Sequence, residues 1–269
     1  MYQFRALQEI SLQQLADCFN LAFSDYEVPT RLTPESLKHY LTASAVDLSL
    51  SFGAFCQNEL VGFILNSKGI YHSETVVFDA GTGVVPEHRG KKVFSLLFDH
   101  TVQELKRCNI SKYYLETLQT NHHAVSIYQK KGFTISREYS VLTGSGPQDG
   151  WDNPISVTAY PDFEVFPTAF SAEPSFEHTS HTISQNPHLY EVLYLPQQAY
   201  CIYAKRTGEI IQMHYNNLDA LKEVMAALVK AYRSAMAKNV DLVHGDVLQA
   251  LQELGFKEII KQYEMVRDI

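Results

Sequence analysis

The chain has 269 residues, of which 45% are hydrophobic and 19% charged, so it can bury one large core or two of ordinary size, and we expect two domains. Its formal net charge of −8 argues against broad nucleic-acid binding and favours solubility, with a weak preference for cationic substrates. The four cysteines lack paired spacing and no apolar run is long enough to cross a bilayer, which predicts buried thiols, a cytoplasmic location and no membrane partner.

The first 65 residues predict a strand, two helices and a hairpin. Alternation over residues 2–7 is typical of a strand, and the helical spacing that follows predicts a helix capped by Ser11. The pair Thr33 and Pro34 is typical of a second helix start. Two strand-like runs within residues 48–65, separated by a short polar turn, predict a hairpin.

A basic turn then joins a strand to an amphipathic helix. The strand is expected at residues 75–85 and the helix at about 90–107, and the turn between them contributes Arg89, Lys91 and Lys92. A helix start presents unpaired backbone N–H groups and the positive end of the helix dipole. The turn is therefore a candidate anion site, most simply for phosphate.

A further strand, helix and strand follow. Residues 112–118 predict a strand, Asn121 can cap the next helix, and Gly132 can end it in the left-handed conformation. Residues 134–142 return to strand character. This order of elements implies a mixed sheet covered by helices.

Two motifs in this order and at this separation resemble the GNAT N-acetyltransferases. The first is Val84–Lys92, with the sequence VVPEHRGKK, and the second runs from Asn121 through Tyr128 to Phe133. The resemblance covers about residues 1–142 and implies an α/β (α+β mixed) fold, with a mainly antiparallel sheet flanked by helices. It also implies acetyl-CoA as co-substrate and a small-molecule or peptide amine as acceptor, attacked directly in a ternary complex.

The resemblance implies a set of cofactor-binding residues. The strand end would pair with the pantetheine arm through its backbone, the turn and helix start would hold the pyrophosphate, and the helix-capping asparagine would hydrogen-bond near the thioester. In this order the residues are Val84 and Val85, then Arg89, Gly90, Lys91, Lys92, Val93 and Phe94, then Asn121. In the family a small residue is usual where Lys92 stands and Gly or Ala where Phe94 stands, so this cradle requires the Phe94 ring to turn into the core.

Two residues are candidates for the chemistry. Tyr128 matches the tyrosine that, in many members of the family, donates a hydrogen bond or proton to the departing thiolate, and a neutral phenol suits that task. An amine acceptor must lose a proton, and Glu116 is the first candidate base, with Asp79 or a water chain as rivals. Tyr128 could instead pack between helix and sheet, and Glu116 could be a solvated strand carboxylate.

Histidines and nucleophiles offer no other chemistry. The neighbours His122 and His123 would point different ways on a helix, and His178 and His181 lie in a polar, irregular stretch, so we expect no metal site. The sequence has no nucleophile elbow and no dinucleotide fingerprint.

The second half predicts a degenerate copy of the first. We expect a GNAT domain at 1–142, a linker and irregular segment at 143–188, and a degenerate copy at 189–269 with strands, a helix at 218–236, a strand at 240–244 and a last helix from 247. Aligning the Gly-Phe pairs of the two halves puts Leu251 on Tyr128. The second half has neither the basic turn nor the tyrosine, so we expect no cofactor site there. Alternatively, a helix ending in Gly-Phe is common and the copies are unrelated.

Two functions from different classes remain. The first is an N-acetyltransferase acting on a primary amine, and the second is a non-catalytic acyl-CoA sensor or scaffold with the same fold. The acceptor would be read by the loops at 25–32 and 144–187, so small amines, aminoglycoside-like polyamines, amino acids and protein N-termini all remain open, as does the oligomeric state.

Overall fold

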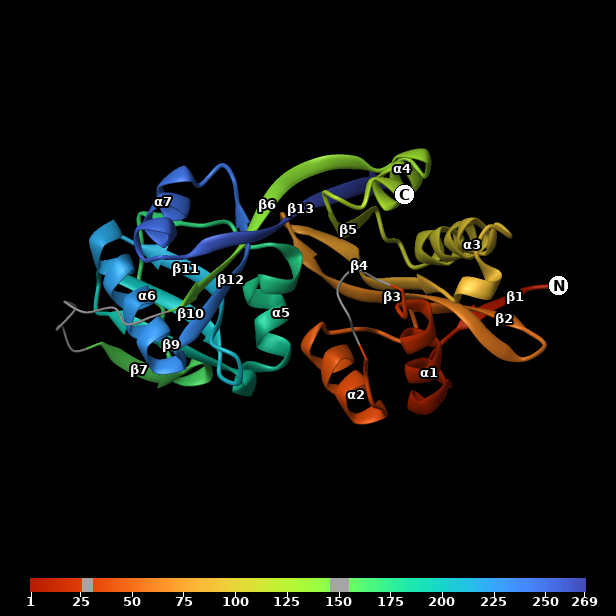
Figure 1. Cartoon of the computed structure of the whole chain (residues 1–269), viewed down its shortest axis with the longest axis horizontal. Helices are drawn as coiled ribbons and strands as arrows, with labels where there is room; N and C mark the ends of the chain where they lie inside the picture. The colour runs from red at the N-terminus through yellow and green to blue at the C-terminus, as the bar shows by residue number, and fades with distance from the viewer. Residues whose placement is uncertain (26–30, 146–154) are drawn as a thin grey trace. The chain divides into compact units, whose positions relative to one another are not determined.

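The computed structural model describes residues 1–25, 31–145 and 155–269. They divide into two compact units, unit 1 with residues 1–115 and 266–269, and unit 2 with residues 116–265. Each unit contains a sheet flanked by helices, as expected (Figure 1).

Unit 1 has a five-stranded sheet in the order β1-β2-β3-β4-β5. Neighbouring strands are antiparallel except β4 and β5, which run parallel over Val76–Asp79 and Lys112–Leu115. In Figure 1, α3 covers one face of this sheet and α1 and α2 cover the other. The elements are β1 Gln3–Ala6, α1 Leu12–Ala22, α2 Pro34–Ala43, β2 Phe52–Cys56, β3 Glu59–Tyr71, β4 Glu74–Val84, the 3-10 turn η1 Pro86–His88, α3 Val93–Arg107 and β5 Lys112–Leu118, of which residues up to 115 belong to this unit.

Local signals placed these elements well. Ser11 accepts a hydrogen bond from the Gln14 N–H, and Thr33 and Ser36 form a capping box ahead of α2. Gln57 and Asn58, with φ of 51° and 67°, form the turn between β2 and β3, as hairpin geometry requires. These predictions are confirmed.

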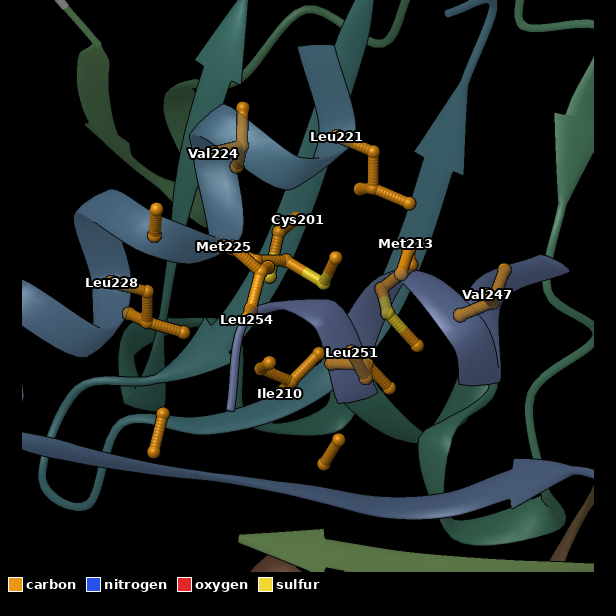
Figure 2. Packing of buried hydrophobic residues seen from close by; sticks show 14 of the residues in the cluster. Cys201, Ile210, Met213, Leu221, Val224, Met225, Leu228, Val247, Leu251 and Leu254 are labelled. Atoms are coloured by element: carbon orange, nitrogen blue, oxygen red, sulfur yellow. The ribbon is translucent and has the colours of Figure 1, made fainter. Parts of the chain in front are cut away.

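Unit 2 has a sheet in the order β13-β6-β12-β11-β10-β9-β7. Its apolar core lies between the strands and the helices α6 and α7, where Met213, Met225 and Leu251 meet (Figure 2). The elements are α4 His122–Lys130, β6 Thr134–Ser145, β7 Ser156–Ala159, η2 Tyr160–Asp162, β8 Phe170–Ser171, η3 Phe176–His178, α5 Ser180–Gln185, η4 Pro187–Leu189, β9 Tyr190–Leu195, β10 Ala199–Ala204, β11 Glu209–Tyr215, α6 Leu218–Tyr232, β12 Ser234–Asp241, α7 Gly245–Glu253 and β13 Lys257–Asp268.

The predicted helix at 218–236 was too long. α6 ends at Tyr232 because Arg233 takes a φ of 59°, and Met236, assigned to its apolar side, lies in β12 and is 37% exposed. The strand expected at 240–244 accordingly begins earlier, at Ser234. The turn-rich stretch at 143–150 falls mostly outside the described residues, and its first three residues continue β6.

The chain contains the same order of elements twice. The first copy, residues 52–145, runs β2-β3-β4-α3-β5-α4-β6, and the second copy, residues 190–268, runs β9-β10-β11-α6-β12-α7-β13. From α4 onward one shift of 123 residues relates the copies, since it carries α4 at 122–130 onto α7 at 245–253 and β6 at 134–145 onto β13 at 257–268. The expectation of a duplicated fold is confirmed.

The last strands of the two copies are exchanged. Gln119 N–H donates to the Lys261 carbonyl and Leu242 N–H to the Glu138 carbonyl, each at 2.9–3.0 Å. The shift of 123 residues converts each of these two hydrogen bonds into the other. β6 of the first copy therefore pairs with β12 of the second. In the same way, β13 of the second copy is the sheet neighbour of β5 of the first. For this reason residues 116–145 belong to the compact unit that holds the second copy.

Candidate functional site

The turn between β4 and α3 has the backbone conformation of an anion cradle. Gly90 and Lys92 take positive φ values of 71° and 62°, and α3 begins at Val93 without a side-chain cap. Within the described residues, no protein acceptor meets the backbone N–H groups of Lys91, Lys92 or Val93. A Cβ atom at Gly90 would meet none of the described residues within 4 Å, and the Lys91 and Lys92 side chains are exposed. The turn can thus receive an anion on backbone N–H groups with two cations beside it.

Arg89 holds the turn in place. Its guanidinium donates to both carboxylate oxygens of Asp25, at 2.6 and 2.9 Å, and to the Ala22 carbonyl at 2.7 Å, while its Nε donates to the Val84 carbonyl at 3.0 Å. The hydrogen bond from Arg89 lowers the pKa of Asp25. Arg89 therefore ties the end of β4 to the end of α1, and the exposed Lys91 and Lys92 are the other two cations of the turn.

Two further predicted cofactor residues have defined surroundings in unit 1. The Val85 N–H donates to the Val61 carbonyl of β3 at 3.0 Å. The Phe94 ring is half-buried and lies against Phe98, with ring centroids 5.7 Å apart, and Phe98 is itself buried. Phe94 thus packs along the apolar side of α3.

Asp79 lies where β4 and β5 separate, because the parallel pairing ends at Asp79 and Leu115. Its carboxylate accepts from the Gly81 N–H at 3.0 Å and from the Thr82 hydroxyl at 2.6 Å. The register of β3 and β4 shifts at this point, between Leu65 and Asn66 of β3, which marks a bulge. Asp79 therefore stabilises the bulge by accepting these two hydrogen bonds.

Asn121 and Tyr128 lie on α4 in unit 2. Asn121 caps the helix by accepting from the Ala124 N–H at 3.1 Å, so its oxygen is engaged in the cap. Tyr128 is half-buried, with its ring edge-on to Phe133 at a centroid distance of 5.6 Å. Gly132, with φ of 87°, ends the helix as predicted.

Glu116 is the first residue of β5 after the segment that pairs with β4, and it lies in a polar cluster of unit 2. Its Oε2 accepts from Asn239 Nδ2 at 2.7 Å, and its Oε1 is buried without a hydrogen-bond partner in the described part of the chain. Burial, reinforced by the nearby Glu177 carboxylate, raises the pKa of Glu116 to about 8, against the effects of Lys238 and Asn239. Glu116 is therefore not a solvated strand carboxylate.

The sequence analysis missed the partners of Glu116. Asn239 also donates to the Ser175 hydroxyl at 3.1 Å, and Lys238 pairs with Glu177 at 3.2 Å. One signal was available: the alignment of the Gly-Phe pairs, extended backwards by the same shift, puts Asn239 on Glu116. The exchanged strands bring these two equivalent positions together.

The strand edge of the second copy is covered by the chain itself. β11 pairs with β12 only at Glu209 and Ile210, and further along β8 pairs with it at His214 and Tyr215. The Ala172 N–H continues this pairing by donating to the Met213 carbonyl at 3.1 Å. The segment 170–178 therefore fills the edge that β12 leaves open.

The described ranges lack two further kinds of feature, a metal-binding cluster and a membrane-spanning helix. They contain no cluster of three or more His, Cys, Asp or Glu residues able to hold a metal ion. None of the helices in those ranges has the length and apolar character needed to span a membrane.

The comparisons with known proteins find a family similarity in the first half of the chain. Residues 12–133 match the model of the Acetyltransferase (GNAT) family. Residues 12–133 of the chain are therefore similar to the GNAT family. Within that half, the GNAT match spans both the basic turn and the α4 motif that suggested the resemblance.

Relatives and solved structures extend the comparison. N-alpha-acetyltransferase 30 of Dictyostelium discoideum is 30% identical over 95 residues, which is 35% of this chain and 51% of the relative, so the chain matches about half the length of this curated relative. A putative acetyltransferase from Pyrococcus horikoshii is 12% identical, with 100% of this chain and 89% of that one covered and a TM-score of 0.72. A tandem GNAT protein from the clavulanic acid biosynthesis pathway is 11% identical, with 100% and 98% covered and a TM-score of 0.66. The whole chain thus has a tandem GNAT-like fold.

Proposed function

We propose that the protein is an N-acetyltransferase that moves the acetyl group of acetyl-CoA to a primary amine. The observation that carries the proposal is the turn before α3, where backbone N–H groups without protein acceptors lie beside Lys91 and Lys92, within a segment of GNAT sequence. A pyrophosphate is an anion of the size and charge that such a turn favours. The half-buried packing of Phe94 against Phe98 supports the proposal, since the ring has an apolar surface to occupy beside the cradle.

The reaction needs one proton donor and one proton acceptor. As the amine nitrogen forms its bond to the acetyl carbon and the C–S bond breaks, Tyr128 hydrogen-bonds or protonates the departing thiolate. Glu116 takes the proton that the amine loses, directly or through a water molecule. A pKa near 8 makes the Glu116 carboxylate a stronger base than an ordinary glutamate, so it suits this role better than Asp79, whose oxygens are engaged in the bulge.

In this proposal the second half of the chain binds no acetyl-CoA of its own. In the first copy the corresponding strand would offer its edge to the pantetheine arm, whereas the segment 170–178 covers the edge of β11. Leu251, at the position equivalent to Tyr128, is completely buried in the core (Figure 2). We therefore expect one acetyl-CoA per chain.

Calorimetry with CoA and a thiol-release assay with acetyl-CoA test the proposal. The amine panel begins with peptide N-termini, because the curated relative is by its name an N-alpha-acetyltransferase, and continues with small amines, amino acids and polyamines. We expect one binding site and acceptor-dependent thiol release. Lys91→Glu should weaken CoA binding about tenfold, while Lys38→Glu, an exposed lysine on α2, serves as the matched charge control.

The variant Tyr128→Phe separates the two functions left by the sequence. Loss of turnover with CoA affinity retained supports the transferase. Binding by the wild-type protein without acceptor-dependent release at any pH supports an acyl-CoA sensor instead. Failure to bind CoA at all would contradict both.

A further inference from the structure

Asn239 has an unusual backbone for a residue in a strand. Its φ is 57°, in the left-handed region, and it lies at the irregularity of β12 between Ala237 and Val240. It is only 4% exposed, and its Oδ1 is buried without a hydrogen-bond partner among the described residues. Such a conformation costs free energy and persists only where the surroundings hold it in place.

The strained residue directs its amide nitrogen at Glu116. Asn239 Nδ2 donates to Glu116 Oε2 at 2.7 Å and to the Ser175 hydroxyl at 3.1 Å, so the two donor hydrogens fix the orientation of the amide. With Oε2 held in this way, Oε1 is the carboxylate oxygen without a hydrogen-bond partner in the part of the chain that the structure describes. The contact therefore determines which oxygen of Glu116 is available to accept a proton.

We propose that Asn239, contributed by the second copy, is a positioning residue that orients the Glu116 carboxylate for proton transfer. This inference rests on the proposed function, because it assigns Asn239 to the base of that reaction. It gives the second half a direct part in the chemistry of the first. The exchange of the last strands explains how, since it places the equivalent positions of the two copies in contact.

Three charged groups, in addition to the neutral amide of Asn239, affect the pKa of Glu116. Glu177 and Glu264 raise its pKa, and Lys238 lowers it, while the hydrogen bond from Asn239 also lowers it by favouring the carboxylate. Removing the amide leaves the other three groups in place. The pKa of Glu116 should then rise, and the pH at which the carboxylate becomes an effective base should rise with it.

The variant Asn239→Gly tests the role against a purely structural one. Glycine adopts a φ of 57° without strain, so the backbone should tolerate the change while the hydrogen bond is lost. Asn109→Gly is the matched control, since Asn109 has the same φ of 57° and is exposed after α3 in unit 1. Asn239→Asp is the second variant, because it keeps a residue that tolerates this backbone but replaces the donor with a carboxylate.

Two readouts on the full-length protein decide the matter. The first is the pH profile of kcat/KM, and the second is the titration of Glu116 followed by NMR of 13C-labelled carboxyl groups, assigned with Glu116→Gln. We expect both midpoints to rise by about half a pH unit or more in Asn239→Gly, further in Asn239→Asp, and not at all in Asn109→Gly, with Asn239→Gly still folded.

Failure of the inference and failure of the proposed function give different results. If both midpoints stay unchanged in Asn239→Gly and Asn239→Asp, Asn239 does not position Glu116. If only the NMR midpoint moves while the kcat/KM profile stays fixed, Asn239 contacts a carboxylate that is not the base, and the inference is also wrong. Absence of wild-type turnover with every amine contradicts the proposed function itself, and the NMR titration still reports the contact.

Discussion

Truncating Leu251 should destabilise the protein far more than changing the equivalent Tyr128. Leu251 is 0% exposed and packs in the core of unit 2 among Met213, Leu254 and their neighbours (Figure 2). Tyr128, in contrast, is half-buried. Leucine-to-alanine changes at such fully buried sites cost about 2–5 kcal/mol, part of it from the cavity that remains. We take about 3 kcal/mol for Leu251→Ala, which corresponds to a fall of about 6–12 °C in Tm for a unit of this size.

The comparison with Tyr128→Leu makes the prediction specific. That change removes the edge-on ring contact with Phe133 and should cost about 1 kcal/mol of unfolding free energy while abolishing the phenol. Urea unfolding followed by circular dichroism, with both variants at the same pH, gives the two free energies. If Leu251→Ala lowers the free energy of unfolding by less than Tyr128→Leu does, then it is wrong that Leu251 serves packing while the equivalent Tyr128 serves chemistry.

Two other perturbations follow from groups of unit 2. The pKa of Glu116 is about 8 in the folded protein against an ordinary 4.5, so ionisation of Glu116 lowers the free energy of unfolding as pH rises from 4.5 to 8. Glu116→Gln should therefore have a higher Tm than wild type at pH 9 and an equal Tm at pH 4. A Tm difference that does not vary with pH would show that burial does not raise this pKa. Arg137 pairs with Asp241 at 2.6 Å, with 10% and 5% of the side chains exposed, and donates to the carbonyls of Glu173 and Pro174. Arg137→Met should cost about 3–5 kcal/mol by leaving a buried carboxylate unpaired, with partial recovery in Arg137→Met/Asp241→Asn, as measured by urea midpoints. A cost below about 1 kcal/mol would mean that water reaches Asp241.

Local physics explains what the sequence predicted of the fold. Caps such as Ser11, Thr33 and Asn121 act within three residues of their own position, and Gly132 needs only its own backbone freedom, so neighbours in sequence suffice to recognise them. The basic turn before α3 is local in the same sense. The end of α6 was misplaced because Arg233 adopts the left-handed conformation there. An arginine side chain gives no sign in the sequence that its backbone takes this conformation.

The candidate site depended on contacts that local patterns do not contain. Sequence reasoning put Arg89 among the phosphate ligands, and the structure adds its bidentate pairing with Asp25, 64 residues away. The domain bounds of 1–142 and 189–269 describe copies of one ancestral fold, and they stay a prediction. They differ from the bounds of the two compact units of the structure.

By itself, the sequence determined the order of the elements in residues 2–142 and 189–256, the duplication of that order and the motifs that resemble GNAT acetyltransferases, because periodicity, capping and turn chemistry act over a few residues. It did not predict β7, β8 and α5, which lie in the segment expected to be irregular. Only the tertiary structure decided that the last strands are exchanged, and hence that Asn239 of one copy meets Glu116 of the other at 2.7 Å. Backbone hydrogen bonds between strands are the same for any pair of partners, so the side chains of β6 and β13 alone do not say which copy each strand joins.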